Sequence, residues 1–329
     1  MKKVLFATSA LVLSAGFAAA EVAVSGDGRM GMIYDGDDIQ FSSRARVLFT
    51  LSGESDAGLS FGGKFRVDQE NYSSNAYRSA ARGTAGAVWI SGTYGKLSMG
   101  DVVSASEAAI GDLYELGYTE GGFAGDIEEI WYLTGDGENL DQGPSILYEY
   151  SIDNISFFAS ATDGSDNVRC NVGQVVGTDE TCDVPGDDAD SDIAYSLAAK
   201  YDAGNWWASL AYGKQGDADE IVLGGEGKFN QFSVKGIYAK YSDRFDGDHE
   251  LDSTIGLAAA YEFDATTIKG FWRRDSWDAV VASASDEDYD SFGIGADYDL
   301  GGGATLAGAI IDSDYQEDTL ADIGVKFKF

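Results

Sequence analysis

Charged side chains are divided unevenly along this 329-residue chain. The segment from Gly111 to Pro144 carries nine Asp and Glu side chains and no Lys or Arg. Basic side chains gather earlier in the chain, at Arg29, Arg44, Arg46, Lys64 and Arg66. Opposed arcs of charge are one way in which a water-filled passage selects among ions and polar solutes. The pattern therefore suggests electrostatic filtering rather than bond breaking.

Catalytic and nucleic-acid-binding functions find little support in the sequence. The single histidine, His249, lies in the acidic stretch 243–251, and there is no G-x-S-x-G motif. A hydrolase would need a nucleophile activated by a neighbouring base. A formal net charge of −34 also disfavours nucleic acid and anionic membrane surfaces as general partners. We therefore expect no enzyme and no nucleic-acid partner.

The first twenty residues have the features of a secretory signal peptide. Lys2 and Lys3 precede an apolar run that ends in the small residues "GFAAA". Cleavage there would leave Glu21 as the mature N-terminus, and a retained membrane anchor is the alternative. The prediction is a signal peptide over 1–20 and one exported domain over 21–329.

The two cysteines, Cys170 and Cys182, lie in one polar segment. An exported chain meets oxidising conditions, so we expect a local disulfide between them, with two free thiols as the alternative.

Most of the remaining chain alternates apolar and polar residues with a period of two, as half-buried β-strands do. In "VAVSGDGRMGMIY", Met30 and Met32 share one face while Asp27 and Arg29 share the other. Sixteen such runs are found, near 21–34, 40–53, 57–70, 84–94, 96–102, 145–151, 154–162, 191–202, 204–214, 219–229, 231–242, 252–264, 266–276, 288–299, 303–312 and 320–329. The least secure boundary is the turn at Phe229-Asn230-Gln231.

Short and long connections alternate between these runs, and the long ones are acidic. Transmembrane β-barrels of outer membranes show this asymmetry together with an even strand count. The prediction is an all-β fold, a 16-stranded antiparallel transmembrane barrel. A soluble β-sandwich is the alternative, but it does not require the difference in loop length.

The longest connection, 103–144, contains many large apolar residues, among them Leu116, Tyr118 and Trp131. A loop exposed to water outside a barrel would have little use for them. We therefore expect this loop to fold inward, pack on the wall and set its carboxylates opposite the basic residues of the first three strands.

Several segments resemble the general diffusion porins of α-proteobacteria related to Rhodobacter and Paracoccus. They are "VSGDGRMGMIYDGDDIQFSSRARVLFTLSG", "GKLSMGD", "SASEAAIGDLYELGYTE", "YLTGD", "YDLGGGATLAGAI" and the terminal "ADIGVKFKF". The resemblance covers essentially the whole mature chain and is weakest across 163–290, where loop lengths and the cysteine pair depart from the pattern.

The resemblance implies an outer-membrane homotrimer in contact with lipid and lipopolysaccharide. Each pore would be narrowed by the third loop and would pass small hydrophilic solutes and ions. The implied acidic side of the constriction is Glu107, Asp112, Glu115, Glu120, Asp126, Glu128 and Glu129, and the basic side is Arg29, Arg44, Arg46, Lys64 and Arg66.

No cofactor is required, and calcium at acidic loop sites is an option because crowded carboxylates suit that ion. We expect weak cation selectivity. A substrate-specific porin and a surface adhesin-type barrel are the competing functions.

Overall fold

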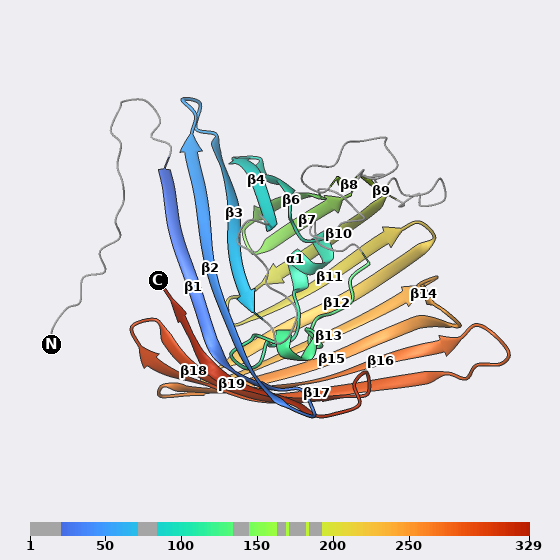
Figure 1. Ribbon diagram of the computed structural model, residues 1–329. Coiled ribbons are helices and arrows are strands. Elements are labelled where there is room, and N and C mark those ends of the chain that lie inside the picture. Colours follow the sequence, from blue (N-terminus) through green and yellow to red (C-terminus); the bar gives the residue numbers. More distant parts are fainter. Residues whose placement is uncertain (1–20, 72–83, 134–144, 163–168, 171–181, 184–192) are drawn as a thin grey trace.

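The strands of the computed structural model close into a single barrel (Figure 1). The structure describes residues 21–71, 84–133, 145–162, 169–170, 182–183 and 193–329. Each long strand pairs antiparallel with the long strand that follows it, and β1 pairs with β19 to close the ring. Closure removes the open edges that a sandwich would have. The predicted signal peptide, 1–20, lies outside the described residues.

Nineteen strands lie in the described part of the chain, and three of them, β8 (Arg169–Cys170), β9 (Cys182–Asp183) and β14 (Phe245–Asp246), have two residues each. The other sixteen form the barrel wall, as the sequence predicts. They are β1 (Glu21–Tyr34), β2 (Ile39–Glu54), β3 (Ser60–Asn71), β4 (Thr84–Gly92), β5 (Gly95–Gly100), β6 (Ser145–Ile152), β7 (Ile155–Ala161), β10 (Ala194–Asp202), β11 (Trp206–Gln215), β12 (Ala218–Phe229), β13 (Phe232–Ser242), β15 (His249–Phe263), β16 (Thr266–Ala279), β17 (Glu287–Gly301), β18 (Ala304–Ser313) and β19 (Leu320–Lys328).

The predicted strand boundaries hold to within a few residues. The insecure turn is confirmed, since Phe229 pairs with Phe232 and Asn230 has a φ of 56°. β15 begins at His249 instead of residue 252 because the short strand β14 extends the pairing to His249 and Glu250. The polar residues there satisfy backbone hydrogen bonds although they break the apolar alternation.

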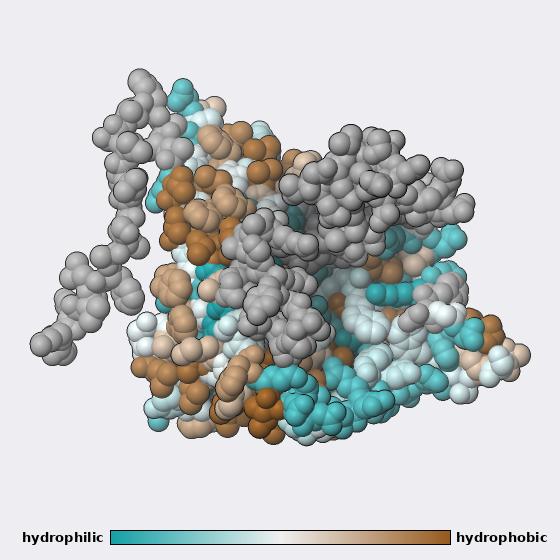
Figure 2. Space-filling model, viewed as in Figure 1, coloured by the Kyte–Doolittle hydropathy of each residue, from teal (hydrophilic) through white to brown (hydrophobic). Residues whose placement is uncertain are grey.

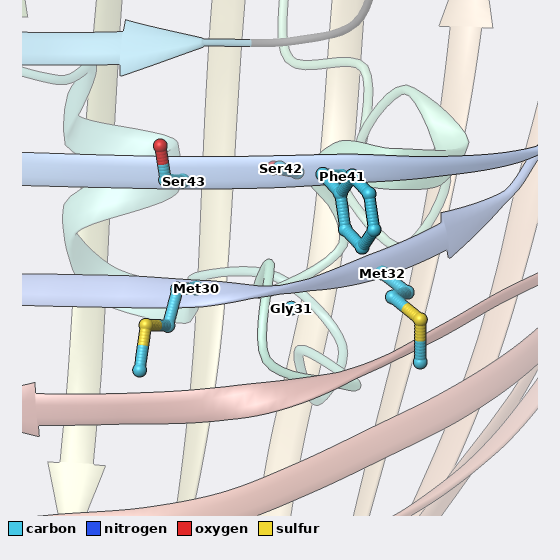
Figure 3. A pocket seen from close by; sticks show the side chains of 6 residues that line it. All are labelled: Met30, Gly31, Met32, Phe41, Ser42 and Ser43. Carbon is cyan, nitrogen blue, oxygen red and sulfur yellow. The ribbon is translucent and has the colours of Figure 1, made fainter.

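The outer face of the barrel is apolar. Met30, Met32 and Phe41 are 60%, 42% and 83% exposed, and they line a shallow outer hollow between β1 and β2 together with Gly31, Ser42 and Ser43. Figure 3 shows Met30, Met32 and Phe41 on the same side of the two strands. Figure 2 shows apolar residues concentrated over the wall formed by β1 to β3 in Figure 1. This apolar exterior is what a barrel in lipid requires.

The opposite face of the same strands carries charge into the lumen. The β1–β2 register places Arg29 opposite Arg44 and Asp27 opposite Arg46. The β1–β19 register then places Lys326 on the other side of Arg29. Neighbouring strands thus bring three basic residues into one row. Within the part of the chain that the structure describes, no helix is long and apolar enough to cross a membrane.

Candidate functional site

The connection between β5 and β6 lies inside the barrel, where α1 is seen enclosed by strands in Figure 1. Helix α1 (Ala105–Ile110) begins where the Ser104 side chain accepts a hydrogen bond from the Glu107 amide. The Ala105 amide donates to the hydroxyls of Ser160 on β7 and Ser196 on β10, at 2.9 Å each. The start of the loop is therefore fixed to the inner wall, and the predicted inward direction is confirmed.

Apolar loop residues pack on glycines of the wall. A Cβ atom on Gly224, Gly256 or Gly293 would lie within 3 Å of Ile110, Leu113 or Leu116 respectively. These glycines belong to β12, β15 and β17. A larger residue at any of them would push the loop toward the centre of the lumen. The wall is thus shaped to receive apolar residues of the loop, as the sequence predicted for Leu116.

The outer part of the loop is bound by a buried arginine. Arg273 on β16 is fully buried and donates to the carbonyls of Ile127, at 3.0 Å, and Glu129. Its Nη2 lies 2.8 Å from Asp275, and its guanidinium lies 4.8 Å from the centre of the Trp131 ring. We call Arg273, Asp275 and Trp131 the anchor.

Asp275 of the anchor has further partners. It accepts hydrogen bonds from the hydroxyls of Thr254 and Tyr315. Its carboxylate is therefore compensated on both oxygens, as a charge buried away from water must be.

The tip of the loop meets the basic row of the wall. Arg44 Nη2 lies 3.1 Å from Asp27 and 3.5 Å from Glu120, and Lys326 lies 3.7 Å from Glu120. Arg29 is buried beneath the tip and donates to the Thr119 carbonyl. The Glu120 side chain is 35% exposed, so this contact reaches water. We call Arg44, Glu120 and Lys326 the tip contact.

Ion pairs continue from the tip contact around the wall. Lys326 lies 3.8 Å from Asp297, and Asp297 lies 3.0 Å from Lys269 of β16. Positive and negative charges therefore alternate along the inner surface, and the field at the tip belongs to a network rather than to one pair.

The other predicted basic residues lie on the inner faces of β2 and β3. Arg46 stands opposite Asp27 and Arg66 opposite Leu48, and both are partly buried. Lys64 stands opposite Thr50 and is exposed. The register thus brings all five predicted basic residues to one side of the lumen.

The predicted acidic residues occupy different environments along the loop. Glu107 is partly buried in the first turn of α1, and Asp112 accepts a 2.7 Å hydrogen bond from the Ile130 amide. Glu115, Asp126 and Glu129 are exposed. The structure therefore gives these carboxylates separate roles.

Glu128 is the acidic residue that lies farthest from water. It is 1% exposed, and its Oε2 accepts no hydrogen bond from the described residues. Its carboxyl packs against Gly121, which has a φ of 89° and no room for a Cβ atom. Glu128 therefore supports the tip from behind and does not line an aqueous path.

Burial changes the proton affinity of the loop carboxyls. Burial raises the pKa of Asp112, although the Ile130 amide and Lys235 act against it. The Glu115 side chain is exposed overall, but the partial loss of water around its carboxyl group, followed by repulsion from Glu120, raises its pKa. Burial raises the pKa of Glu128 to about 8, with smaller contributions from Asp126 and Glu115. Glu128 is therefore mostly protonated at pH 7.

Several wall residues that hold the loop were not predicted as site residues. Arg244 donates to the Trp131 carbonyl and Lys235 donates to the Asp112 carbonyl. Lys326, Lys235 and Arg273 all lie at inward positions of alternating strands, so the period-two pattern contained the signal. The pattern does not show which of these inward residues contact the loop.

The cysteine prediction is only partly described. Strands β8 and β9 pair with Cys170 directly opposite Cys182, but their side chains lie outside what the structure describes. The disulfide stays a prediction. In the described residues, no group of three or more His, Cys, Asp or Glu is arranged to hold a metal ion.

Comparisons with known proteins agree with this architecture. A family model for Gram-negative porins matches residues 7–318. A porin of Rhodobacter capsulatus is 38% identical over 94% of this chain and 100% of its own length. A porin of Fuscovulum blasticum is 27% identical over the same shares. A porin structure refined at 1.8 Å resolution superposes with a TM-score of 0.73 at 36% identity, covering 94% of this chain and 100% of that one.

Proposed function

This chain belongs to the Gram-negative porin family, whose members are outer-membrane channels rather than enzymes, and we propose that its lumen loop forms a charged constriction. The constriction admits small hydrophilic solutes and ions by passive diffusion. The observation that carries the proposal is the tip contact, in which Glu120 reaches Arg44 and Lys326 in contact with water.

A transverse field follows from this arrangement. The described part of the loop, 101–133, holds acidic side chains and no Lys or Arg, while the facing wall carries the basic row. At physiological ionic strength, charges are screened over about 8 Å, so such a field acts locally at a narrow point. Polar solutes align in it, and apolar solutes would have to displace ordered water.

Weak cation preference is the expected ionic behaviour. Glu115, Asp126 and Glu129 are exposed on the loop, and the chain carries a net charge of −34. These carboxylates raise the local concentration of cations. The basic row opposes them, which keeps the preference weak.

Planar-bilayer recordings test the function directly. Purified protein should form water-filled channels with ohmic conductance, opening in groups of three if the homotrimer is correct. Reversal potentials in a KCl gradient should show potassium passing more readily than chloride. Folded protein that does not conduct would exclude the channel, and an anion preference would exclude the assigned selectivity.

Three further assignments accompany the proposal. We propose that residues 1–20 are removed, which the intact mass of the mature protein would show. We propose a homotrimer embedded among lipid and lipopolysaccharide, to be checked by light scattering in detergent. We propose that Cys170 and Cys182 form a disulfide, so that alkylation would add mass only after reduction.

A further inference from the structure

A tryptophan on the inner wall holds a lysine that contacts no counter-ion among the described residues. Lys200 Nζ on β10 lies 4.0 Å from the centre of the Trp207 ring on β11. Among the described residues, this ammonium makes no hydrogen bond and no ion pair, since Asp202 and Glu226 influence it only from a distance. Lysines elsewhere on the wall, such as Lys326 and Lys269, contact carboxylates. Lys200 differs from these two lysines in having no carboxylate in contact among the described residues.

A second ammonium approaches the same ring. Lys235 Nζ on β13 lies 5.6 Å from the centre of Trp207 and donates to the Asp112 carbonyl, a neutral partner. Lys200, Trp207 and Lys235 all occupy inward positions, because they alternate with the outward-facing residues Tyr201, Trp206 and Val234. Two positive charges thus flank one indole ring in the lumen.

The ring is held rigidly in place. Trp207 Nε1 donates to Glu226 Oε2 at 3.1 Å, and the Tyr114 hydroxyl of the loop donates to Glu226 Oε1 at 3.1 Å. Lys228 lies 3.6 Å from the same carboxylate and is mostly exposed. Both oxygens of Glu226 are therefore engaged, and the geometry exists before any solute arrives. Preformed geometry lowers the entropic cost of binding.

The two ammonium groups at the ring can accept an anion. Lys200 and Lys235 contact no carboxylate among the described residues, since Glu226, Asp202 and Asp112 act on them only from a distance and the oxygens of Glu226 are already engaged by Trp207, Tyr114 and Lys228. An ammonium resting on an exposed aromatic ring gains less than one that donates to a carboxylate. The partly exposed indole adds apolar surface beside the charge. A carboxylate with a flat apolar body satisfies both features.

We propose that Lys200, Trp207 and Lys235 form a binding site for small organic carboxylates that carry a flat apolar body. The site lies between the loop and the short turns that join β10 to β11 and β12 to β13. The inference rests on the proposed channel function. It adds that the channel binds one class of solute during passage. Retention slows the transit of the anion, so the site is compatible with weak cation preference.

Benzoate is a suitable probe, recorded on single channels in KCl. Rising sodium benzoate at constant ionic strength should reduce the wild-type conductance reversibly and with saturation, and acetate should act several-fold more weakly. Lys200→Met should raise the half-effective benzoate concentration about tenfold, as expected for the loss of one charge-assisted contact. Trp207→Leu should raise the half-effective concentration of benzoate to nearly that of acetate.

The matched control is Lys96→Met, which removes one exposed lysine that is paired with Glu149 and belongs neither to this site nor to the constriction. It should leave the half-effective benzoate concentration unchanged. A wild-type channel insensitive to benzoate, equal effects of benzoate and acetate, or equal effects of the Lys200 and Lys96 variants would each overturn the site. Absence of any KCl conductance would instead refute the channel, so the two failures are distinguishable. Heat-modifiable migration on gels shows that each variant is folded.

Discussion

The anchor and the tip contact both use arginine to hold the same loop, but they differ in their access to water. Arg273 and Asp275 are completely buried, and Arg273 also binds two loop carbonyls. In the tip contact, Glu120 remains one-third exposed and lies 3.5 Å from Arg44. One arginine is enclosed among rings and carbonyls, and the other belongs to a hydrated network.

The difference separates two roles of charge. Removing one partner of a buried ion pair strongly destabilises the fold, because the remaining charge is neither paired nor solvated by water. A partly exposed pair contributes little to stability, because water replaces the lost partner. The anchor therefore determines where the loop lies, and the tip contact determines the field that a passing ion meets.

Removing the arginine of the anchor should have the largest effect. Arg273→Met leaves Asp275 buried without its cation and frees the carbonyls of Ile127 and Glu129. We expect the free energy of unfolding to fall by about 3–5 kcal/mol. The loop should also lose its fixed position, which would appear as noisy, enlarged single-channel conductance. Urea unfolding in detergent and bilayer recording measure the two effects.

The neighbouring arginine supplies the control. Arg274 lies on the opposite face of β16, where it is partly exposed and bonds Asp290, 2.9 Å from Nε to Oδ1, so Arg274→Met should leave both measurements nearly unchanged. Replacing both anchor charges, Arg273→Met with Asp275→Leu, should recover part of the lost stability, because no buried charge remains. Equal losses of stability in the Arg273 and Arg274 variants would show that burial does not distinguish the anchor from a partly exposed ion pair.

Glu128 should have the next largest effect, which is a dependence of the free energy of unfolding on pH. Its pKa rises from 4.5 to about 8 in the folded protein, so the folded state holds this proton more tightly than the unfolded chain. The free energy of unfolding should therefore fall as the pH rises between these values, by about 1.4 kcal/mol per pH unit at most, and level off above pH 8. Melting temperatures measured from pH 5 to pH 9 would show the slope.

Glu128→Gln should flatten most of this slope, because the amide stays neutral throughout. A residual slope should remain, since loss of water also raises the pKa of Asp112 and Glu115. The matched variant Glu129→Gln changes an exposed neighbour and should keep the wild-type slope. If both variants behaved alike, the buried carboxyl would not be the source of the pH dependence.

The sequence predicts the wall better than the contacts made inside it. Alternation alone locates the inward faces that carry Arg29 and Arg44, because the period of a strand decides which side chains face the lumen. The anchor was missed because it depends on Arg273 meeting residues some 140 positions earlier in the chain. The burial of Glu128 was missed for a similar reason, since it follows from the path of the loop around Gly121 and not from residue type.

The smallest effect on stability, and a specific effect on selectivity, is expected at the tip contact. Glu120→Gln removes one negative charge from a partly exposed position between Arg44 and Lys326. Stability should change by less than about 1 kcal/mol. The two freed cations should lower the permeability ratio of potassium to chloride, which reversal potentials in a KCl gradient measure. Arg44→Gln should raise the same ratio. If Glu120→Gln left the ratio unchanged but destabilised the protein as much as Arg273→Met, the tip contact would be a second anchor and not part of the filter.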